Sequence, residues 1–281
     1  MKTPDLQTEV AGRVRSSELL CSIAGTPTTD IYNFSGGMES AAMLYLCREE
    51  IGRTQAHVVW ADTGKQLPEM AESIAQIEII CGLAITRLQP SMSFDEFLFE
   101  RGGMLRQGYT DCSRRMKRRA LREHANSLPR PQRIALGYNA DEGQRGHDFS
   151  ERNDKPDRKF FFPLQTLNVD RAESVKVCER AGFRILLDMY RKMGRFDCFF
   201  CPNQRIAQAE KVMVHYPAQW EEWKAIEKRK GHAILSISAE AIEKRALQAD
   251  FIEALDRKPQ CACFGGKDAW DDDDAPMLHN H

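Results

Sequence analysis

The sequence predicts an α/β protein in which a parallel sheet carries helices on both faces, followed by a helical C-terminal portion. Three observations lead to this class. Short apolar runs alternate with helix-like stretches up to about residue 165, glycine, serine and acidic residues follow directly after several of these runs, and the later chain is mainly helical in pattern. Strands that alternate with helices are typical of parallel sheets, which bind ligands at the carboxyl ends of their strands.

The elements are expected in the following order. Apolar runs predict strands at residues 30–34, 56–60, 83–88, 132–136 and 159–162. Between them, helices are expected at residues 38–51, 68–80 and 111–125, with an earlier helix at 6–23 and a short one opened by the capping box Ser93–Glu96. Four further helices are expected at 169–181, 205–214, 218–229 and 238–255. We therefore divide the chain into an α/β domain, residues 1–165, and a helical segment, residues 166–281, that ends in an acidic tail.

Composition excludes some classes of function. The 40 Lys and Arg residues balance 41 Asp and Glu residues, so there is no global charge that would favour nucleic acid. One dense basic run, Arg114 to Arg122, is either a solvated helix face or a surface for anions, from sulfate or pyrophosphate to the backbone of tRNA or DNA. No apolar stretch is long enough to span a membrane, and the first residues lack the apolar core of a secretory signal. We therefore expect a cytoplasmic protein with no membrane partner.

The segment with the clearest chemistry is the turn Ser35-Gly36-Gly37-Met38-Glu39-Ser40, which lies between the first strand and its helix. Two glycines allow the backbone to approach a ligand closely. The serine hydroxyls and the start of a helix favour phosphate oxygens. The turn lacks the Gly-Lys-Ser/Thr ending of a Walker A loop, which argues against a P-loop NTPase.

This turn resembles the pyrophosphate loop of the PP-loop superfamily, the adenine nucleotide α-hydrolases, whose usual form is Ser-Gly-Gly-x-Asp-Ser. Glu39 stands where Asp is usual and keeps the charge on a longer arm. The resemblance implies an adenine nucleotide α-hydrolase-like fold. It also implies an adenine nucleotide with Mg²⁺, a catalytic role for Glu39, and a loop whose binding residues are Ser35, Gly36, Gly37, Glu39 and Ser40.

Two further segments resemble one branch of this superfamily, the phosphoadenosine phosphosulfate (PAPS) reductase family. They are Asp62-Thr63-Gly64, after the second strand, and Gly137 to Arg145, after the fourth. The resemblance extends from about residue 31 to 203, including a Phe-x-Pro-Leu stretch at 161–164. It implies nucleotide contacts from Asp62, Gly64, Gly137, Glu142 and Arg145. Arg145 is also expected to act in catalysis, because a guanidinium can grip phosphate or sulfate oxygens in a bidentate manner.

Nine cysteines suggest a metal or redox site, because disulfides are rare in the cytosol. Cys112 and the pair Cys198-x-x-Cys201 match the places where iron–sulfur members of the family have cysteines, although Asp111 replaces the first of them. The resemblance implies a 4Fe–4S cluster on Cys112, Cys198 and Cys201, with Cys263 or Cys261 as fourth ligand. A three-cysteine cluster with an open iron, as in some tRNA sulfur-transfer relatives, also fits. Zinc and a redox dithiol are the alternatives, since Cys-x-x-Cys alone does not separate them.

Two reactions fit the family resemblance. In the first, ATP is cleaved to an adenylate and pyrophosphate, and sulfur then displaces the adenylate. In the second, a thiolate attacks adenosine phosphosulfate (APS) or PAPS and sulfite is released. We expect the first, because the complete Ser-Gly-Gly-x-acid-Ser loop favours ATP. A non-catalytic nucleotide-binding subunit of a nucleic-acid modification complex is a third reading. A sulfur donor or a reductant protein is the implied partner.

Overall fold

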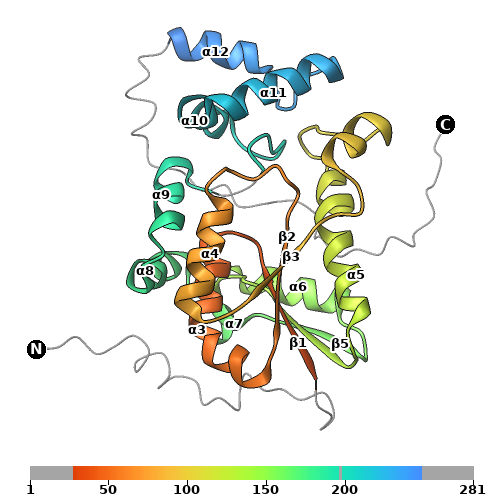
Figure 1. The fold of residues 1–281 in the computed structure, drawn as a ribbon, viewed down its shortest axis with the longest axis vertical. Helices are drawn as coiled ribbons and strands as arrows, with labels where there is room; N and C mark the ends of the chain where they lie inside the picture. Colours follow the sequence, from red (N-terminus) through yellow and green to blue (C-terminus); the bar gives the residue numbers. More distant parts are fainter. Residues whose placement is uncertain (1–27, 196–197, 249–281) are drawn as a thin grey trace, which may run out of the picture.

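The computed structural model describes residues 28–195 and 198–248 of the 281-residue chain. Its centre is a five-stranded parallel sheet with strand order β3-β2-β1-β4-β5 (Figure 1). The strands are β1 (Thr29–Phe34), β2 (His57–Ala61), β3 (Ile85–Leu88), β4 (Gln132–Ala135) and β5 (Arg158–Phe161). The prediction of a parallel α/β sheet is therefore confirmed, and each strand lies within two residues of its expected bounds.

Helices follow the strands and continue after the sheet. Around the sheet lie α3 (Met38–Thr54), α4 (Met70–Cys81), α5 (Arg119–Ser127), α6 (Gly143–Asn153) and the short α7 (Pro163–Thr166). Short turns precede some of them: η1 (Glu96–Glu100), η2 (Ser113–Arg118) and η3 (Ala140–Glu142). The later helices are α8 (Arg171–Ala181), α9 (Arg184–Met193), α10 (Ile206–His215), α11 (Pro217–Lys230) and α12 (Ala239–Gln248).

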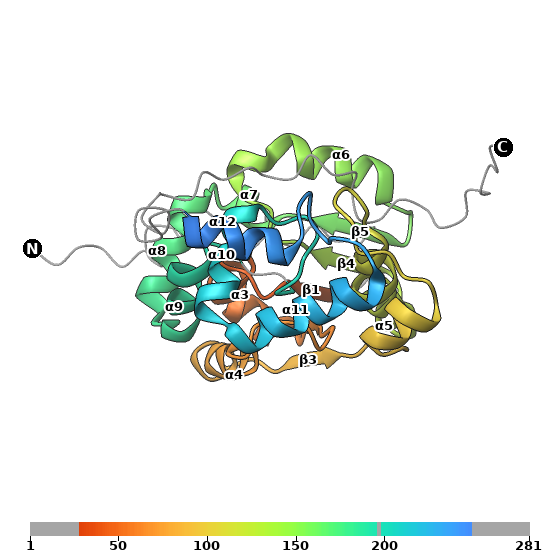
Figure 2. The same cartoon turned by 90° about the horizontal axis from the view of Figure 1, so that it is seen from above.

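Both faces of the sheet are buried, as the alternation of side chains along each strand requires. On β1, Tyr32 and Phe34 belong to the large core that includes α3, α4, α8 and α9, whereas Ile31 faces a smaller core. The smaller core is closed by residues of α5 and α6, namely Ala125 and Phe149. Helices therefore cover both faces, as expected from the sequence (Figure 2).

Several elements differ from the sequence-based expectation. Helices α6, α7 and α9 and the short η3 were not predicted, and the expected helix at 111–125 begins as a π-helical turn, η2, before it continues as α5. Helix α8 begins at Arg171 because the side chain of Asp170 accepts a hydrogen bond of 2.7 Å from the Glu173 N–H and caps it. The helix expected at 6–23 lies outside the described residues, as does the end of the one expected at 238–255.

The last three helices lie over the edge of the sheet where the strands end (Figures 1 and 2). Helix α11 is fastened there by Lys65, in the loop after β2, which forms an ion pair with Glu222. At its other end, Lys230 donates to the carbonyl oxygens of Leu98 (3.0 Å) and Gly103 (3.1 Å). Helix α11 therefore covers part of this edge of the sheet and shields it from solvent.

The division into residues 1–165 and 166–281 stays a prediction. Helix α8 packs directly against α3, and one continuous core joins the sheet to α10, α11 and α12. Within the described residues, no helix combines the length and the apolar character needed to cross a bilayer.

Candidate functional site

The loop from Ser35 to Ser40 joins the end of β1 to the start of α3 and has a closed network of hydrogen bonds. Ser40 Oγ donates to the carbonyl oxygen of Gly37 (2.9 Å) and accepts from the Ser35 N–H (3.2 Å). The two hydroxyl oxygens, of Ser35 and Ser40, are 2.9 Å apart, and the Gly37 N–H donates to Ser35 Oγ (3.3 Å). The loop is therefore fixed in shape in front of the first N–H groups of α3, which have no partners inside the helix.

Two glycines allow neighbouring loops to close around this turn. Gly36 has a φ of +87°, and a Cβ at this position would lie 3.2 Å from the Sδ of Met70 and 3.7 Å from the Nε1 of Trp60. A Cβ on Gly137, after β4, would lie 3.1 Å from the Cα of Ser40. From β1 the sheet grows first on one side, through β2 and β3, and then on the other side, through β4 and β5. The loops after β1 and β4 therefore lie at the point where the strand order reverses, which is where parallel sheets bind ligands.

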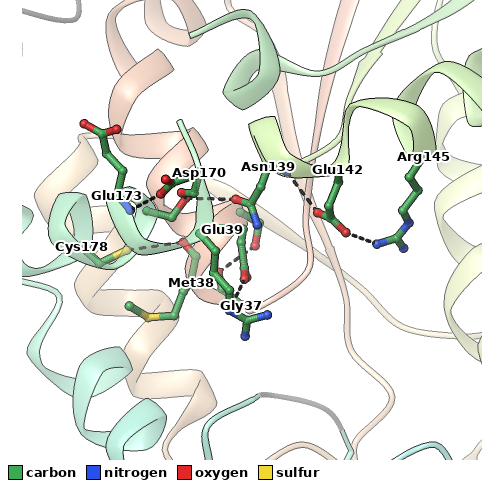
Figure 3. Close-up of polar contacts among 12 residues, drawn as sticks. Gly37, Met38, Glu39, Asn139, Glu142, Arg145, Asp170, Glu173 and Cys178 are labelled. Carbon is green, nitrogen blue, oxygen red and sulfur yellow. Dashed lines mark hydrogen bonds and ion pairs between the residues drawn. The ribbon is translucent and has the colours of Figure 1, made fainter. Parts of the chain in front are cut away.

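Glu39 has a partner that the sequence did not single out. Its Oε1 lies 3.6 Å from the Nε of Arg171, the first residue of α8, and both side chains are partly exposed. Figure 3 shows Glu39 between the glycine turn and the start of α8, where Asp170 and Glu173 lie. The longer arm of Glu relative to Asp extends toward this arginine. The only signal for Arg171 in the sequence is its position after the helix-capping Asp170.

The segment after β4 is organised around Glu142. This carboxylate accepts from the Asn139 N–H (3.1 Å) and from Nη1 of Arg145 (2.5 Å), as Figure 3 shows. The guanidinium of Arg145 also lies 4.3 Å from the ring centroid of Tyr138. Asn139 in turn accepts from the Ser174 hydroxyl (3.2 Å). Arg145 is therefore placed at the start of α6 with its charge balanced by Glu142.

The loop after β2 is a tight turn. Asp62 Oδ1 accepts a hydrogen bond from the Gly64 N–H (2.7 Å), and Gly64 has a φ of +71°. Between them, Thr63 is only 5% exposed, and its Oγ1 lies 3.2 Å from the Sγ of Cys198. The expected nucleotide loop and the expected metal ligand are therefore in direct contact, which their separation in sequence did not indicate.

The described cysteines fall into two groups. Cys47, Cys81 and Cys178 are buried, and burial raises the pKa of the Cys47 and Cys81 thiols to about 12, as expected for thiols that only fill space. Cys112 and Cys198 are partly exposed. Burial first, and then the neighbouring Cys198, raises the pKa of Cys112 to about 11.

Cys201 completes the second group. Its N–H donates to the carbonyl oxygen of Cys198 (2.9 Å), so the Cys-x-x-Cys segment forms a tight turn. Among the described residues, the ligand atoms of Cys112, Cys198 and Cys201 do not all lie within 4.8 Å of one another; a group that does is exposed on α6 and consists of His147, Asp148 and Glu151. Cys261 and Cys263 lie outside the described residues.

The basic run is partly engaged in ion pairs. Arg114 and Arg115 approach the Asp111 carboxylate (3.0 and 3.5 Å), and Arg119 pairs with Glu123 (2.8 Å). The run begins on η2, directly after Cys112, and continues along α5. A contact with tRNA or DNA through Arg114 to Arg122 stays a prediction.

Comparison with known sequences gives two findings. Residues 29–164 match the family model of the phosphoadenosine phosphosulfate reductase domain. An uncharacterized protein of Methanocaldococcus jannaschii is 24% identical over 206 residues, which cover 69% of this chain. The chain spans 40% of the length of that curated relative.

Three solved structures show similarity at low sequence identity. A PAPS reductase from Candida auris, in a phosphate complex, is 15% identical and has a TM-score of 0.46 over 65% of this chain and 84% of its own. A U34-tRNA thiolase from Methanococcus maripaludis with its 4Fe–4S cluster is 14% identical, with a TM-score of 0.44 over 82% and 80%. An NMN synthetase from Francisella tularensis is 12% identical, with a TM-score of 0.42 over 92% and 97%.

The family match spans all five strands and the three loops that meet at their carboxyl ends. It agrees with the fold, the glycine turn after β1 and the order of the segments after β2 and β4. Residues 29–164 therefore match the phosphoadenosine phosphosulfate reductase domain family, in agreement with the resemblance seen in the sequence, and the chain has an adenine nucleotide α-hydrolase-like fold.

Proposed function

We propose that this chain is an enzyme that binds ATP and cleaves it between the α- and β-phosphates, forming an adenylate for sulfur-transfer chemistry. The observation that carries this proposal is the complete hydroxyl and glycine network of Ser35 to Ser40 at the start of α3. Such a loop offers backbone donors and a helix N-terminus to the oxygens of a pyrophosphate. Pyrophosphate is the group that leaves when an acceptor oxygen attacks the α-phosphorus.

The residues around the loop have the chemistry for this step. The Glu39 carboxylate, which is partly exposed, would hold Mg²⁺ beside the phosphates, and the ion would neutralise charge on them. Arg171 lies within reach of the same carboxylate and brings a positive charge to where negative charge develops on the leaving group. Arg145, held by Glu142, supplies a second guanidinium at the neighbouring loop. The adenosine would lie along Asp62, Gly64 and Gly137.

The cysteines fit a metal centre beside this nucleotide. Cys112 and Cys198 are neighbours, Cys198 and Cys201 share one turn, and thiols are the ligands that iron–sulfur clusters require. The sulfur atoms of the three cysteines do not all lie within 4.8 Å of one another, whereas a tetrahedral zinc ion would hold its sulfurs only about 3.8 Å apart. This wider separation of the sulfurs favours a cluster over a single zinc ion. Such a cluster would supply an iron or a redox equivalent next to the adenylate. Cys263, or alternatively Cys261, is proposed as the fourth ligand.

Sulfonucleotide reduction is the second candidate, and the family match favours it. In that reaction a thiolate would form a bond to the sulfur of APS or PAPS, the sulfur–oxygen bond to the nucleotide would break, and a second thiol would release sulfite. A nucleotide-binding subunit without turnover is the third candidate. The proposed function also includes three partners. They are an acceptor for the adenylyl group, a sulfur donor or reductant protein, and tRNA or DNA bound at the basic run.

One pair of assays separates these candidates. The full chain, purified without oxygen, is incubated with ATP and Mg²⁺, and AMP and pyrophosphate are measured; a parallel sample receives APS or PAPS with a dithiol, and sulfite is measured. We expect water to take the place of the acceptor oxygen in this assay, so that ATP is hydrolysed to pyrophosphate and AMP in equal amounts, and we expect no sulfite. Sulfite without pyrophosphate would overturn the proposal in favour of reduction, and tight ATP binding without either product would favour the non-catalytic subunit.

A further inference from the structure

The loop after β2 and the cysteine segment are joined at two points, although they are far apart in sequence. The Oγ1 of Thr63 lies 3.2 Å from the Sγ of Cys198, and the Phe199 N–H donates to the carbonyl oxygen of Lys65 (3.1 Å). Thr63 is buried, so water does not readily replace its hydroxyl as the partner of the sulfur. The contact is specific to a side-chain hydroxyl at this position.

Each of the two segments is rigid within itself. On one side, the hydrogen bond from Gly64 to Asp62 closes the turn around Thr63. On the other side, the Cys201 N–H donates to the carbonyl oxygen of Cys198, and Nε2 of Gln204 donates to the carbonyl oxygen of Phe199 (2.8 Å). If the backbone of Asp62 or Gly64 moves, Thr63 moves with it, because all three residues belong to one hydrogen-bonded turn. Through its contact with Cys198, Thr63 then moves the segment from Cys198 to Gln204.

We propose that Thr63 is a positioning residue that couples nucleotide binding to the order of the segment from Cys198 to Gln204. The proposal rests on the proposed function, since it takes the nucleotide to lie against Asp62 and Gly64. A nucleotide that fixes this turn also fixes the Thr63 hydroxyl, and the hydroxyl holds Cys198 in place. Coupling between two sites is reciprocal, so an ordered cysteine segment in turn strengthens nucleotide binding. A single hydrogen bond of ordinary strength corresponds to a coupling of about three- to tenfold.

The test compares two variants in the full chain. Thr63→Val removes the hydroxyl and keeps the shape, whereas Thr63→Ser keeps the hydroxyl and serves as the matched control. Amide hydrogen exchange is measured by mass spectrometry on peptides that cover residues 198–204, with and without ATP and Mg²⁺. We expect ATP to slow exchange about three- to tenfold in the wild type and in Thr63→Ser. In Thr63→Val the slowing should be smaller, because only the backbone hydrogen bond between Phe199 and Lys65 still joins the two segments.

Calorimetric titration of ATP into each protein shows whether a negative result contradicts the coupling alone or the proposed function as well. Equal slowing in Thr63→Val, or no slowing in a wild-type protein that binds ATP, overturns the coupling while the proposed function stands. Absence of ATP binding by the wild type overturns the proposed function and the coupling together. A purely structural role for Thr63 would raise exchange in Thr63→Val equally with and without ATP, which also contradicts the proposal.

Discussion

Gly36→Val is expected to lower the affinity for ATP by at least about tenfold, because a β-branched residue does not tolerate the backbone of this turn. The φ of +87° at Gly36 costs an L-residue about 1–2 kcal/mol. A Cβ would also approach Met70 to 3.2 Å. Relaxation of the turn would move the Gly37 N–H and the Ser35–Ser40 hydroxyl pair out of place. Isothermal titration with ATP and Mg²⁺ measures the change.

Two further variants make this result interpretable. Gly52→Ala lies in α3, the helix that follows the loop; its Cβ meets nothing within 4 Å, and the variant should leave the affinity unchanged. Gly137→Ala presses on the backbone of Ser40 from the other side, at 3.1 Å, and should weaken ATP binding without changing Gly36. Circular dichroism melting curves establish that each variant is folded. Folded Gly36→Val and Gly137→Ala proteins with wild-type affinity would contradict the assignment of this loop.

Cys198→Ser is expected to lower the affinity for the metal at least about tenfold, since loss of a ligand should exceed the 10–100-fold cost typical of a lost outer-shell partner, and the purified variant should therefore contain less metal than the wild type. Cys198 is the central ligand of the proposed centre, because it neighbours Cys112 and shares a turn with Cys201. Iron, zinc and acid-labile sulfide are measured on protein purified without oxygen, together with the visible absorbance. A brown wild-type protein with iron and sulfide would support the cluster, and one zinc ion per chain would contradict it.

Cys47→Ala is the matched control for this variant. Cys47 is buried in α3 among the apolar residues of the large core, where its side chain fills space. The variant should retain the metal content of the wild type. Equal metal loss in both variants would point to general destabilisation, and full metal content in Cys198→Ser would remove this cysteine from the proposed centre.

The sheet and its first loop could be predicted because their signals are local. The strands lie in or next to short apolar runs such as Val58 to Ala61 in β2, and the buried residues on both faces of β1 and β2 are the mark of a parallel sheet. The glycine turn after β1 combines backbone freedom with hydroxyl groups over only six residues. Helix α6, by contrast, was missed because it is mostly polar and begins at Gly143, and within it only Gly146, Phe149 and Asn153 are buried.

The contacts between distant segments could not be predicted from the sequence. Thr63 and Cys198 meet because the cysteine turn packs against the loop after β2, and no local pattern encodes that packing. Arg171 reaches Glu39 because α8 packs along α3, which brings the first residue of α8 to the glycine turn. The fourth cysteine ligand stays a prediction, because Cys261 and Cys263 lie outside the described residues.

Competition by pyrophosphate tests the central claim most directly, because it asks whether the Ser35–Ser40 turn holds the phosphate oxygens of the nucleotide. ATP with Mg²⁺ is titrated into the wild-type protein by calorimetry, first alone and then in the presence of inorganic pyrophosphate. We predict one saturable site per chain whose apparent affinity falls as pyrophosphate is added. ATP binding that pyrophosphate does not affect, or no ATP binding at all, would contradict this account.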